Sequence, residues 1–375
     1  MPAASEIDRK VSRLAAAAAA AGAGGVLILA HWNFAWLTGG ASNRIDVSRE
    51  AGAGALLVGS DGRRVILANE IEMPRLASEE LNGLDFEPVS FPWIDERADP
   101  AFLARRAAEV LRAGLLAADL PIGGALPFEP TLSKLRTQLE PEDIQRYRQL
   151  GADVGRSVGD AVRSLPSGVT EDEAIRVVGA SVLRAGARPL VLLAAADERL
   201  LRFRHPIPTA MPWRDRLMVA VCAERHGLVV ALSRLVALRP PDAEILHRLS
   251  AAQNVFAALL RASVPGASAA SLFEVAAGAY AAEGYPGEEA RHHQGGGIGY
   301  KSREWIAHPR ATETLTVPTA LAWNPSVTGT KVEDTCLLHQ EGLEIITRSP
   351  GWPVREVSAQ GRTLLVADHL VLPES

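Results

Sequence analysis

Hydrophobic residues recur with two different periods in the first third of the chain. Residues 6–22 carry apolar side chains at helical spacing and end on glycine, which predicts a helix with its stop signal. The apolar run at 25–30 is typical of a buried strand, and residues 54–69 hold two apolar runs around Ser-Asp-Gly, as in a hairpin. Residues 99–117 again show helical spacing. This alternation predicts an α/β layer domain, which we assign to residues 1–137.

Two helices with clear start signals follow. Pro141 stands at an expected first helical position, acidic residues occupy the next turn, and helical spacing continues to about Leu165. Thr170 precedes a second helical segment, and Glu173 completes a capping box with it. These signals predict a change of organisation shortly before Pro141.

The remainder of the chain mixes helices and strands. Helical spacing recurs at 242–264 and 267–283. Between and after the helices, five apolar runs predict strands: PLVLLAA, RLMVAVCA, GLVVALSRL, ALAWN and EDTCLLH. We therefore predict a mixed α+β domain over residues 138–375, and a division into two domains suits the length of 375 residues.

Composition narrows the possible classes of protein. A hydrophobic content of 47% can form a sizeable core, and a net charge of −5 argues against a nucleic-acid partner. The alanine-rich segment near the start is broken by glycines and too short to cross a membrane, and it lacks a signal-peptide cleavage pattern. Cys222 and Cys336 lie in apolar runs and are expected to be buried thiols. We expect a cytoplasmic protein without a membrane partner.

The segment RLMVAVCAERHGLVVALSRLVAL predicts a second hairpin. If Arg225 and His226 form its two-residue loop, Ala220 lies directly opposite Ala231. The Cβ atoms of such a pair are about 4.5–5.5 Å apart. Two carboxylates at these positions could share a pair of metal ions, but both residues are alanine.

The segment LAWNPSVTGTKVEDT, residues 321–335, carries Asn324, Glu333 and Asp334 among small and turn-forming residues. Such a pattern is compatible with a surface hairpin. It is also compatible with a metal site that has lost part of its coordination shell.

Three motifs together resemble one known family. The alanine-bearing hairpin, HHQGGGIGYKSRE at 292–304 and WNPSVTGTKVEDT at 323–335 are similar to motifs of the creatinase/aminopeptidase P/methionine aminopeptidase family. HWNFAWLTGG at 31–40 resembles its N-terminal domain, and EPEDIQRYRQLGADVGRSV at 140–158 resembles the start of its catalytic domain. The resemblance covers nearly all of the chain. It implies an α/β creatinase-like N-terminal domain followed by an α+β pita-bread domain.

The resemblance also implies a ligand set that this chain has mostly lost. The metallopeptidases of this family bind two divalent metal ions through two Asp, one His and two Glu. Matched motif by motif, these ligand positions fall on Ala220, Ala231, Gly296, Asn324 and Glu333. Only Glu333 keeps the ligand, and one carboxylate with one amide cannot hold a pair of hard metal ions. We therefore expect no metal and no other cofactor.

Other residues of the implied pocket could still carry chemistry. The family's additional histidines match His205 and His292, while Arg303 replaces a third. His293, Tyr300 and Asn324 are further candidates for substrate binding. The resemblance implies His205 or His292 as general acid or base, Glu333 positioning or activating water, and Arg303 holding a carboxylate or phosphate. Creatinase is the family precedent, because it hydrolyses a guanidino C–N bond without metal, although this chain keeps only one of the two glutamates used there.

Three functions remain open at this stage. The first is a metal-independent enzyme, a hydrolase or lyase acting on a small carboxylate-bearing amide, amidine or guanidino compound. The second is a non-catalytic pseudopeptidase that binds a small molecule, a peptide or a protein. The third is a metal site rebuilt from His292, His293, Glu333 and Asp334, which is disfavoured because adjacent histidines on a strand point to opposite faces. The role of the N-terminal domain in this family implies a homodimer.

Overall fold

The computed structural model describes residues 4–359 and 362–372. The chain divides into two compact units. The first contains residues up to Asp143 together with His226–Leu228, and the second contains Ile144–Arg225 and the chain from Val229 onward. The main division lies at residue 143, a few residues after the predicted domain boundary at 137.

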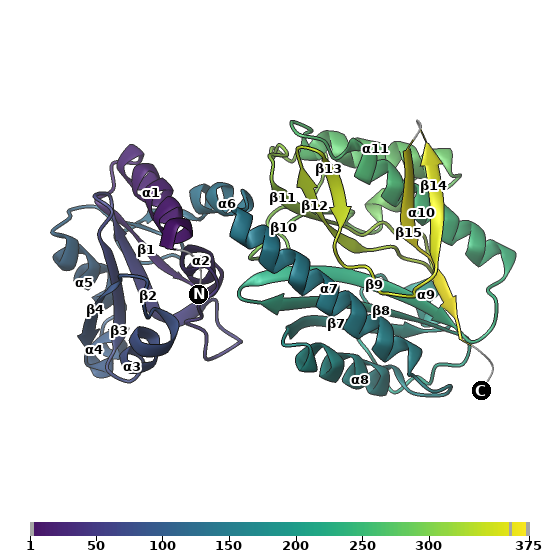
Figure 1. Ribbon diagram of the computed structural model, residues 1–375, viewed down its shortest axis with the longest axis horizontal. Helices are drawn as coiled ribbons and strands as arrows, with labels where there is room; N and C mark the ends of the chain where they lie inside the picture. Colours follow the sequence, from purple (N-terminus) through teal and green to yellow (C-terminus); the bar gives the residue numbers. More distant parts are fainter. Residues whose placement is uncertain (1–3, 360–361, 373–375) are drawn as a thin grey trace. The chain divides into compact units, whose positions relative to one another are not determined.

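The first unit is built on one six-stranded mixed sheet (Figure 1). Its strands are β1 (Gly25–Ala30), β2 (Ala51–Gly59), β3 (Arg64–Asn69), β4 (Glu87–Phe91), β5 (Ala117–Ala118) and β6 (Leu126–Pro127), in the order β4-β3-β2-β1-β5-β6. β2 and β3 pair antiparallel, as the predicted hairpin requires, whereas β3 with β4 and β1 with β5 are parallel. The expected α/β layer domain is therefore present.

The helices of the first unit are α1 (Ala4–Ala20), α2 (His31–Thr38), α3 (Met73–Arg75), a π-helical turn η1 (Leu76–Glu80), α4 (Trp93–Ala98), α5 (Phe102–Leu111) and α6 (Glu129–Thr137). Helix α5 is shorter than the predicted 99–117, because Arg112 adopts a left-handed conformation with φ of 53° and ends it. Helix α2 was not predicted. Its residues from Trp32 to Thr38 are all buried, so it has no polar face to mark it in the sequence.

The second unit contains α7 (Pro141–Arg163, which begins in the first unit), α8 (Glu171–Arg184), α9 (Arg199–Arg202), α10 (Ala243–Ala262), α11 (Ala269–Ala282) and a 3₁₀ turn η2 (Glu288–Ala290). The capping box at the start of α8 is confirmed: the Thr170 hydroxyl accepts from the Glu173 backbone N–H, and the Glu173 carboxylate accepts from the Thr170 backbone N–H. All four long helices lie where their spacing predicted them.

Three sheets complete the second unit. The strands are β7 (Arg188–Ala196), β8 (Arg216–Arg225), β9 (Leu228–Ala237), β10 (Gly295–Ile298), β11 (Thr319–Trp323), β12 (Asp334–His339), β13 (Gly342–Ile345), β14 (Val354–Ala359), β15 (Arg362–Ala367) and β16 (His369–Val371). Their orders are β16-β9-β8-β7, β10-β11-β12-β13 and β14-β15. All five predicted strands are present.

A large hydrophobic core packs two of the second unit's helices against one of its sheets. Helices α10 and α11 lie side by side against the sheet β10–β13 (Figure 1), with Phe256 and Tyr280 packed among residues such as Trp323 and Leu338. Each large apolar side chain buried in this way contributes about 1.5–3 kcal/mol. The two four-stranded sheets meet where the Thr335 side chain bonds the backbone N–H and C=O of Ala231 at 2.7 and 2.9 Å. This junction sets the beginning of β12 against β9.

The hairpin of β8 and β9 turns one residue later than predicted. His226 and Gly227 both have positive φ, at 54° and 78°, and the strands end at Arg225 and resume at Leu228. Two positive φ values define a type I′ turn, for which Xaa-Gly is a common sequence. Regular pairing around this turn places Ala220 opposite Ser233, so the predicted opposition of Ala220 and Ala231 is wrong.

Candidate active site

A cavity of about 310 Å³ in the second unit gathers most of the predicted site residues. Its polar lining consists of His205, His293, Ser302, Arg303, Asn324, Lys331 and Glu333, and its apolar wall of Val191, Leu193, Ala220 and Val221, with Cys222 beside them. Strands β7 and β8 supply the apolar wall, and the segments flanking β10 and preceding β12 supply the polar groups. Two predicted site residues, His292 and Tyr300, are not part of this lining.

Glu333 is the most strongly held group of the cavity. Its carboxylate accepts from the Ser233 hydroxyl at 2.7 Å, from the Lys331 ammonium at 2.8 Å and from the Arg303 guanidinium at 3.0 Å. Burial by itself would raise the pKa of Glu333, but the charges of Lys331 and Arg303 and the hydrogen bonds from Lys331 and Ser233 lower it well below its ordinary value. Glu333 is therefore a carboxylate with both oxygens already engaged.

Lys331 was not identified from the sequence. Its side chain is only 5% exposed and its ammonium bonds Glu333 directly. The sequence does contain a signal for the pairing of Lys331 with Glu333. Residues two apart in an extended segment share one side, and Lys-Val-Glu places the lysine and the glutamate on that side. Without the burial of both residues, the same pattern is typical of a solvated strand.

Three histidines converge beside this charged group. The Nε2 atoms of His205 and His292 are 3.0 Å apart, and the ring centroid of His293 lies 5.4 Å from that of His205 and 4.8 Å from that of His292. The prediction that the adjacent histidines point to opposite faces is wrong, because both precede β10 in irregular backbone. No alternation of side chains applies there.

All three imidazoles are neutral at neutral pH. Burial, followed by the charge of Lys331, lowers the pKa of His292 to about 2. Burial, followed by the charge of Arg303, lowers the pKa of His293 to about 4, and burial also lowers that of the more exposed His205. The cluster therefore presents uncharged rings that can accept or donate hydrogen bonds.

The family's pair of metal ions does not fit these residues. The carboxylate of Glu333 would have to bind the metal ions, but it is already paired with the cationic side chains of Lys331 and Arg303. Ala220 offers no ligand atom, and a Cβ at Gly296 would collide with the carbonyl oxygen of Trp305 and stand 2.8 Å from its ring. No side chain can replace Gly296 without moving Trp305.

The histidine cluster is the one group within residues 4–359 and 362–372 whose donor atoms could hold a single metal ion, since its ring nitrogens all lie within 4.8 Å of one another. Three imidazoles suit Zn²⁺ better than Mg²⁺ or Mn²⁺. The nearby positive charges that lower the histidine pKa values also oppose a divalent cation. The predicted metal site that included Asp334 is not formed. The Asp334 carboxylate instead accepts hydrogen bonds from Arg234 and Thr347 at 3.0 and 2.7 Å.

The remaining candidates divide between the cavity and the core. Asn324 and Arg303 line the cavity, whereas Tyr300 is buried outside this lining, and its role in substrate binding stays a prediction. Cys336 is buried as predicted, but Cys222 is only half-buried in the cavity wall. Burial raises the pKa of the Cys222 thiol to about 11, so it is not a nucleophile at neutral pH.

Comparison with known proteins agrees with this architecture. No family model matches the chain. An uncharacterized peptidase of Staphylococcus aureus strain MW2 is 21% identical over 308 residues, which is 78% of this chain and 87% of that protein. Among solved structures, dipeptidase PepE from Mycobacterium ulcerans superposes with a TM-score of 0.78 at 18% identity, covering 99% of both chains. The prolidase from Pyrococcus horikoshii OT3 gives 0.76 at 18% identity over 91% of this chain and 98% of that chain.

These likenesses define the class of protein. The chain has the pita-bread fold shared by prolidases, dipeptidases and aminopeptidase P, with an α/β domain before it. The resemblance predicted from the motifs is confirmed at the level of the fold. No helix within the described ranges is long and apolar enough to cross a bilayer.

Proposed function

We propose that this protein is an enzyme that hydrolyses a C–N bond in a small carboxylate-bearing amide, amidine or guanidino compound without the metal pair of its structural relatives. Three unpartnered polar atoms support this proposal most directly. Arg303 Nε, Asn324 Oδ1 and His293 Nδ1 are buried, have no hydrogen-bond partner among the described residues, and belong to side chains that line one cavity. A buried polar atom left unpaired costs about 1–3 kcal/mol, so all three are suited to a ligand's polar groups.

The chemistry of these atoms specifies the ligand. Arg303 Nε is a hydrogen-bond donor of the charged guanidinium group and therefore suits a carboxylate oxygen. Asn324 Oδ1 is an acceptor and suits an N–H group. The apolar wall of Val191, Leu193 and Val221 suits an aliphatic portion. These features together describe a small compound with a carboxylate and an N–H, as in N-substituted amino acids.

The reaction would use the histidines for proton transfer and the cations for charge stabilisation. A neutral imidazole takes a proton from a water molecule while the water oxygen bonds to the substrate carbon. The imidazole then gives this proton to the leaving nitrogen as the C–N bond breaks. Lys331, whose side chain lines the cavity, would stabilise the negative charge of the tetrahedral intermediate, while Arg303 holds the substrate carboxylate. Glu333, whose oxygens are engaged, holds these two cations instead of activating water as the sequence suggested.

The alternative of a non-catalytic binding protein is supported by the same ion pairs. A carboxylate neutralised by Lys331 and Arg303 has lost the basicity used by the metal-dependent relatives, and a site of this kind could hold a ligand without reacting with it. Product analysis separates the two functions.

The test combines metal analysis, calorimetric binding and product detection on the purified full chain. The probes are N-acyl amino acids, guanidino acids and dipeptides. We expect no stoichiometric metal, and binding that is lost in Arg303→Ala. The matched control is Arg225→Ala. Arg225 is similarly buried and pairs with Asp153 at a distance of 2.9 Å, but neither residue belongs to the cavity lining.

Release of an amine or urea product establishes the enzyme, and binding without product establishes the binding protein. Stoichiometric metal that is required for turnover would refute metal independence. Equal loss of binding in Arg303→Ala and Arg225→Ala would remove Arg303 from the proposed site.

A further inference from the structure

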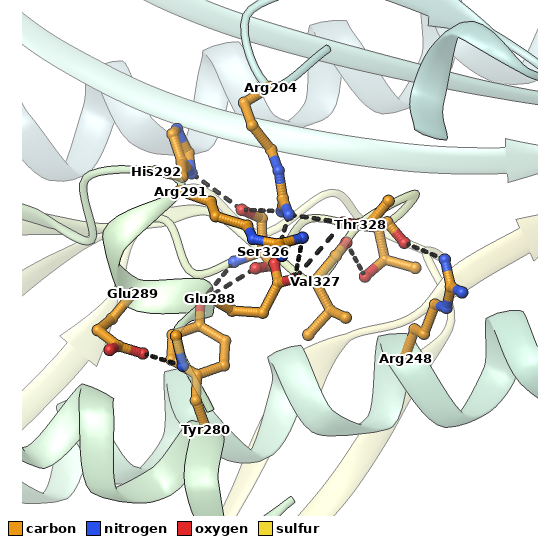
Figure 2. A network of polar contacts seen from close by, with 12 residues as sticks. Arg204, Arg248, Tyr280, Glu288, Glu289, Arg291, His292, Ser326, Val327 and Thr328 are labelled. Carbon is orange, nitrogen blue, oxygen red and sulfur yellow. Dashed lines mark hydrogen bonds and ion pairs between the residues drawn. The ribbon is translucent and has the colours of Figure 1, made fainter. Parts of the chain in front are cut away.

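A chain of polar contacts connects His292 through Ser326 to Arg204 and Glu288 (Figure 2). Glu288 pairs with the Arg204 guanidinium, whose Nη1 donates to the Ser326 hydroxyl at 2.9 Å. The same hydroxyl lies 3.0 Å from Nδ1 of His292, and Nε2 of His292 lies 3.0 Å from Nε2 of His205. The chain therefore links a buried ion pair to a ring that lines the cavity.

The serine hydroxyl determines the direction of these bonds. The Arg204 guanidinium can only donate hydrogen bonds, so the Ser326 oxygen accepts from it. The Ser326 hydroxyl hydrogen then remains available to donate to another acceptor. Among the described residues, the other partner of this oxygen is His292 Nδ1, and Ser326 is only 2% exposed. If Nδ1 carried a hydrogen, the serine hydroxyl would be buried without an acceptor. The fully satisfied arrangement has Ser326 donating to an unprotonated Nδ1.

The direction then passes to the next ring. A neutral His292 with an unprotonated Nδ1 carries its hydrogen on Nε2, which donates to Nε2 of His205. His205 accepts at Nε2 and, when neutral, carries its own hydrogen on Nδ1. A ring fixed in this state offers the cavity a hydrogen-bond donor.

We propose that Ser326, oriented by Arg204, is a positioning residue that holds His292 as the Nε2–H tautomer and His205 as the Nδ1–H tautomer. His205 then polarises the substrate carbonyl or amidine group by donating a hydrogen bond. His293, whose Nδ1 has no partner among the described residues, is left to take the proton from water and deliver it to the leaving nitrogen. This assignment of roles rests on the proposed function, whereas the tautomers do not.

Both ends of the Ser326–His292 bond are anchored by a shared pair of side chains, Tyr280 and Gln294. The backbone N–H of Ser326 donates to the Tyr280 hydroxyl at 2.8 Å, and that hydroxyl lies 2.8 Å from Oε1 of Gln294. Gln294 in turn donates from Nε2 to the backbone carbonyl of His292. Ser326 follows Asn324-Pro325, where the resembled family motif has glycine, so the hydroxyl that directs the chain is a feature of this protein.

The tautomers can be measured without knowing the substrate. Histidine-selective ¹⁵N labelling of the full chain and two-bond ¹H–¹⁵N correlation at pH 7.5 report which nitrogen of each ring is protonated, and His292→Gln and His205→Gln assign the signals. We expect Nε2–H for His292 and Nδ1–H for His205. Ser326→Ala should shift the ratio of His292 tautomers about fivefold or more toward Nδ1–H, which is the effect of losing one buried hydrogen bond.

Two further variants separate tautomer control from general disturbance. Thr328→Ala removes another hydroxyl that Arg204 bonds, at 2.8 Å, but one with no bond to His292, so it should leave both tautomers unchanged. Ser326→Thr keeps the hydroxyl and should retain the wild-type pattern.

A proton on Nδ1 of His292 in the wild-type protein would overturn the proposal, and so would an unchanged pattern in a folded Ser326→Ala variant. If Ser326→Ala does not fold, the wild-type spectrum and Ser326→Thr still decide the question. Correct tautomers in a protein that releases no product from any probe would refute the hydrolase function while leaving the tautomer assignment intact.

Discussion

The buried pair of Lys331 and Glu333 provides the sharpest test of how the cavity is held together. The Lys331→Met substitution keeps most of the side chain's length but removes its charge. Glu333 would retain Arg303 at 3.0 Å and Ser233 at 2.7 Å, but it would lose the closer of its two cations. The exposed pair of Arg148 and Glu344, at 2.9 Å, is the matched control.

The expected loss of stability follows from burial. Two unit charges 2.8 Å apart, as in the Lys331–Glu333 pair, attract by about 6 kcal/mol at an effective dielectric constant of 20. Part of this is offset because the substitution removes the cost of burying the ammonium. Removing one partner of a buried pair costs about 3–5 kcal/mol, and the bonds that Glu333 keeps favour the lower end, so we expect about 3 kcal/mol. Arg148→Met should cost less than about 1 kcal/mol, because the side chains of its pair are 50% and 42% exposed.

Urea unfolding at pH 7, followed by tryptophan fluorescence, measures both variants, and both substitutions lie in the second unit. Glu333 has a depressed pKa, so its contribution is complete above its unfolded pKa and is lost as the pH falls through the folded value. Removing Lys331 raises the folded pKa toward the unfolded value, so the pH-dependent loss of stability should be smaller and should be complete at a higher pH. Equal costs for Lys331→Met and Arg148→Met would refute the claim that cations hold this carboxylate.

Other features of the second unit lead to separate expectations. His293 has a folded pKa of about 4, below its unfolded value, so the unfolded state gains protons first as the pH falls from about 6.5. Over this window His293 should account for a loss on the order of 3 kcal/mol by urea unfolding, in addition to the loss from His292, and His293→Gln should remove the His293 part of the slope. Gly296→His, which would place the family's histidine at this position, should destabilise the protein by more than about 3 kcal/mol, since the new side chain meets Trp305. The control is Gly278→Ala in α11, where nothing lies within 4 Å of the added Cβ. It should be neutral or stabilising by up to about 1 kcal/mol in the same assay. Thr170→Ala should cost about 1 kcal/mol through loss of the cap of α8, and Thr170→Ser should recover most of it.

The sequence by itself determined the elements of the second unit and the fold class. Helical spacing, the capping box of Thr170 and the apolar runs of the strands are local signals, and local hydrogen bonding and hydrophobic periodicity are sufficient to read them. That Ala220 and Gly296 offer no side-chain metal ligand was also visible, because it depends on residue type alone. The buried helix α2 and the turn at His226 were not correctly predicted, since neither has a distinctive amphipathic pattern.

The side chains that meet in the cavity could be identified only from the three-dimensional structure. Lys331 meets Glu333 in a buried pair, and His205 meets two histidines 87 and 88 residues further along the chain, because sheets distant in sequence join beside the cavity. Whether a lysine faces solvent or a buried carboxylate, and which atom of a serine faces an imidazole, depends on packing between segments that carry no mutual signal in the sequence. The chemistry of this site therefore resides in long-range contacts, while the framework that creates them is encoded locally.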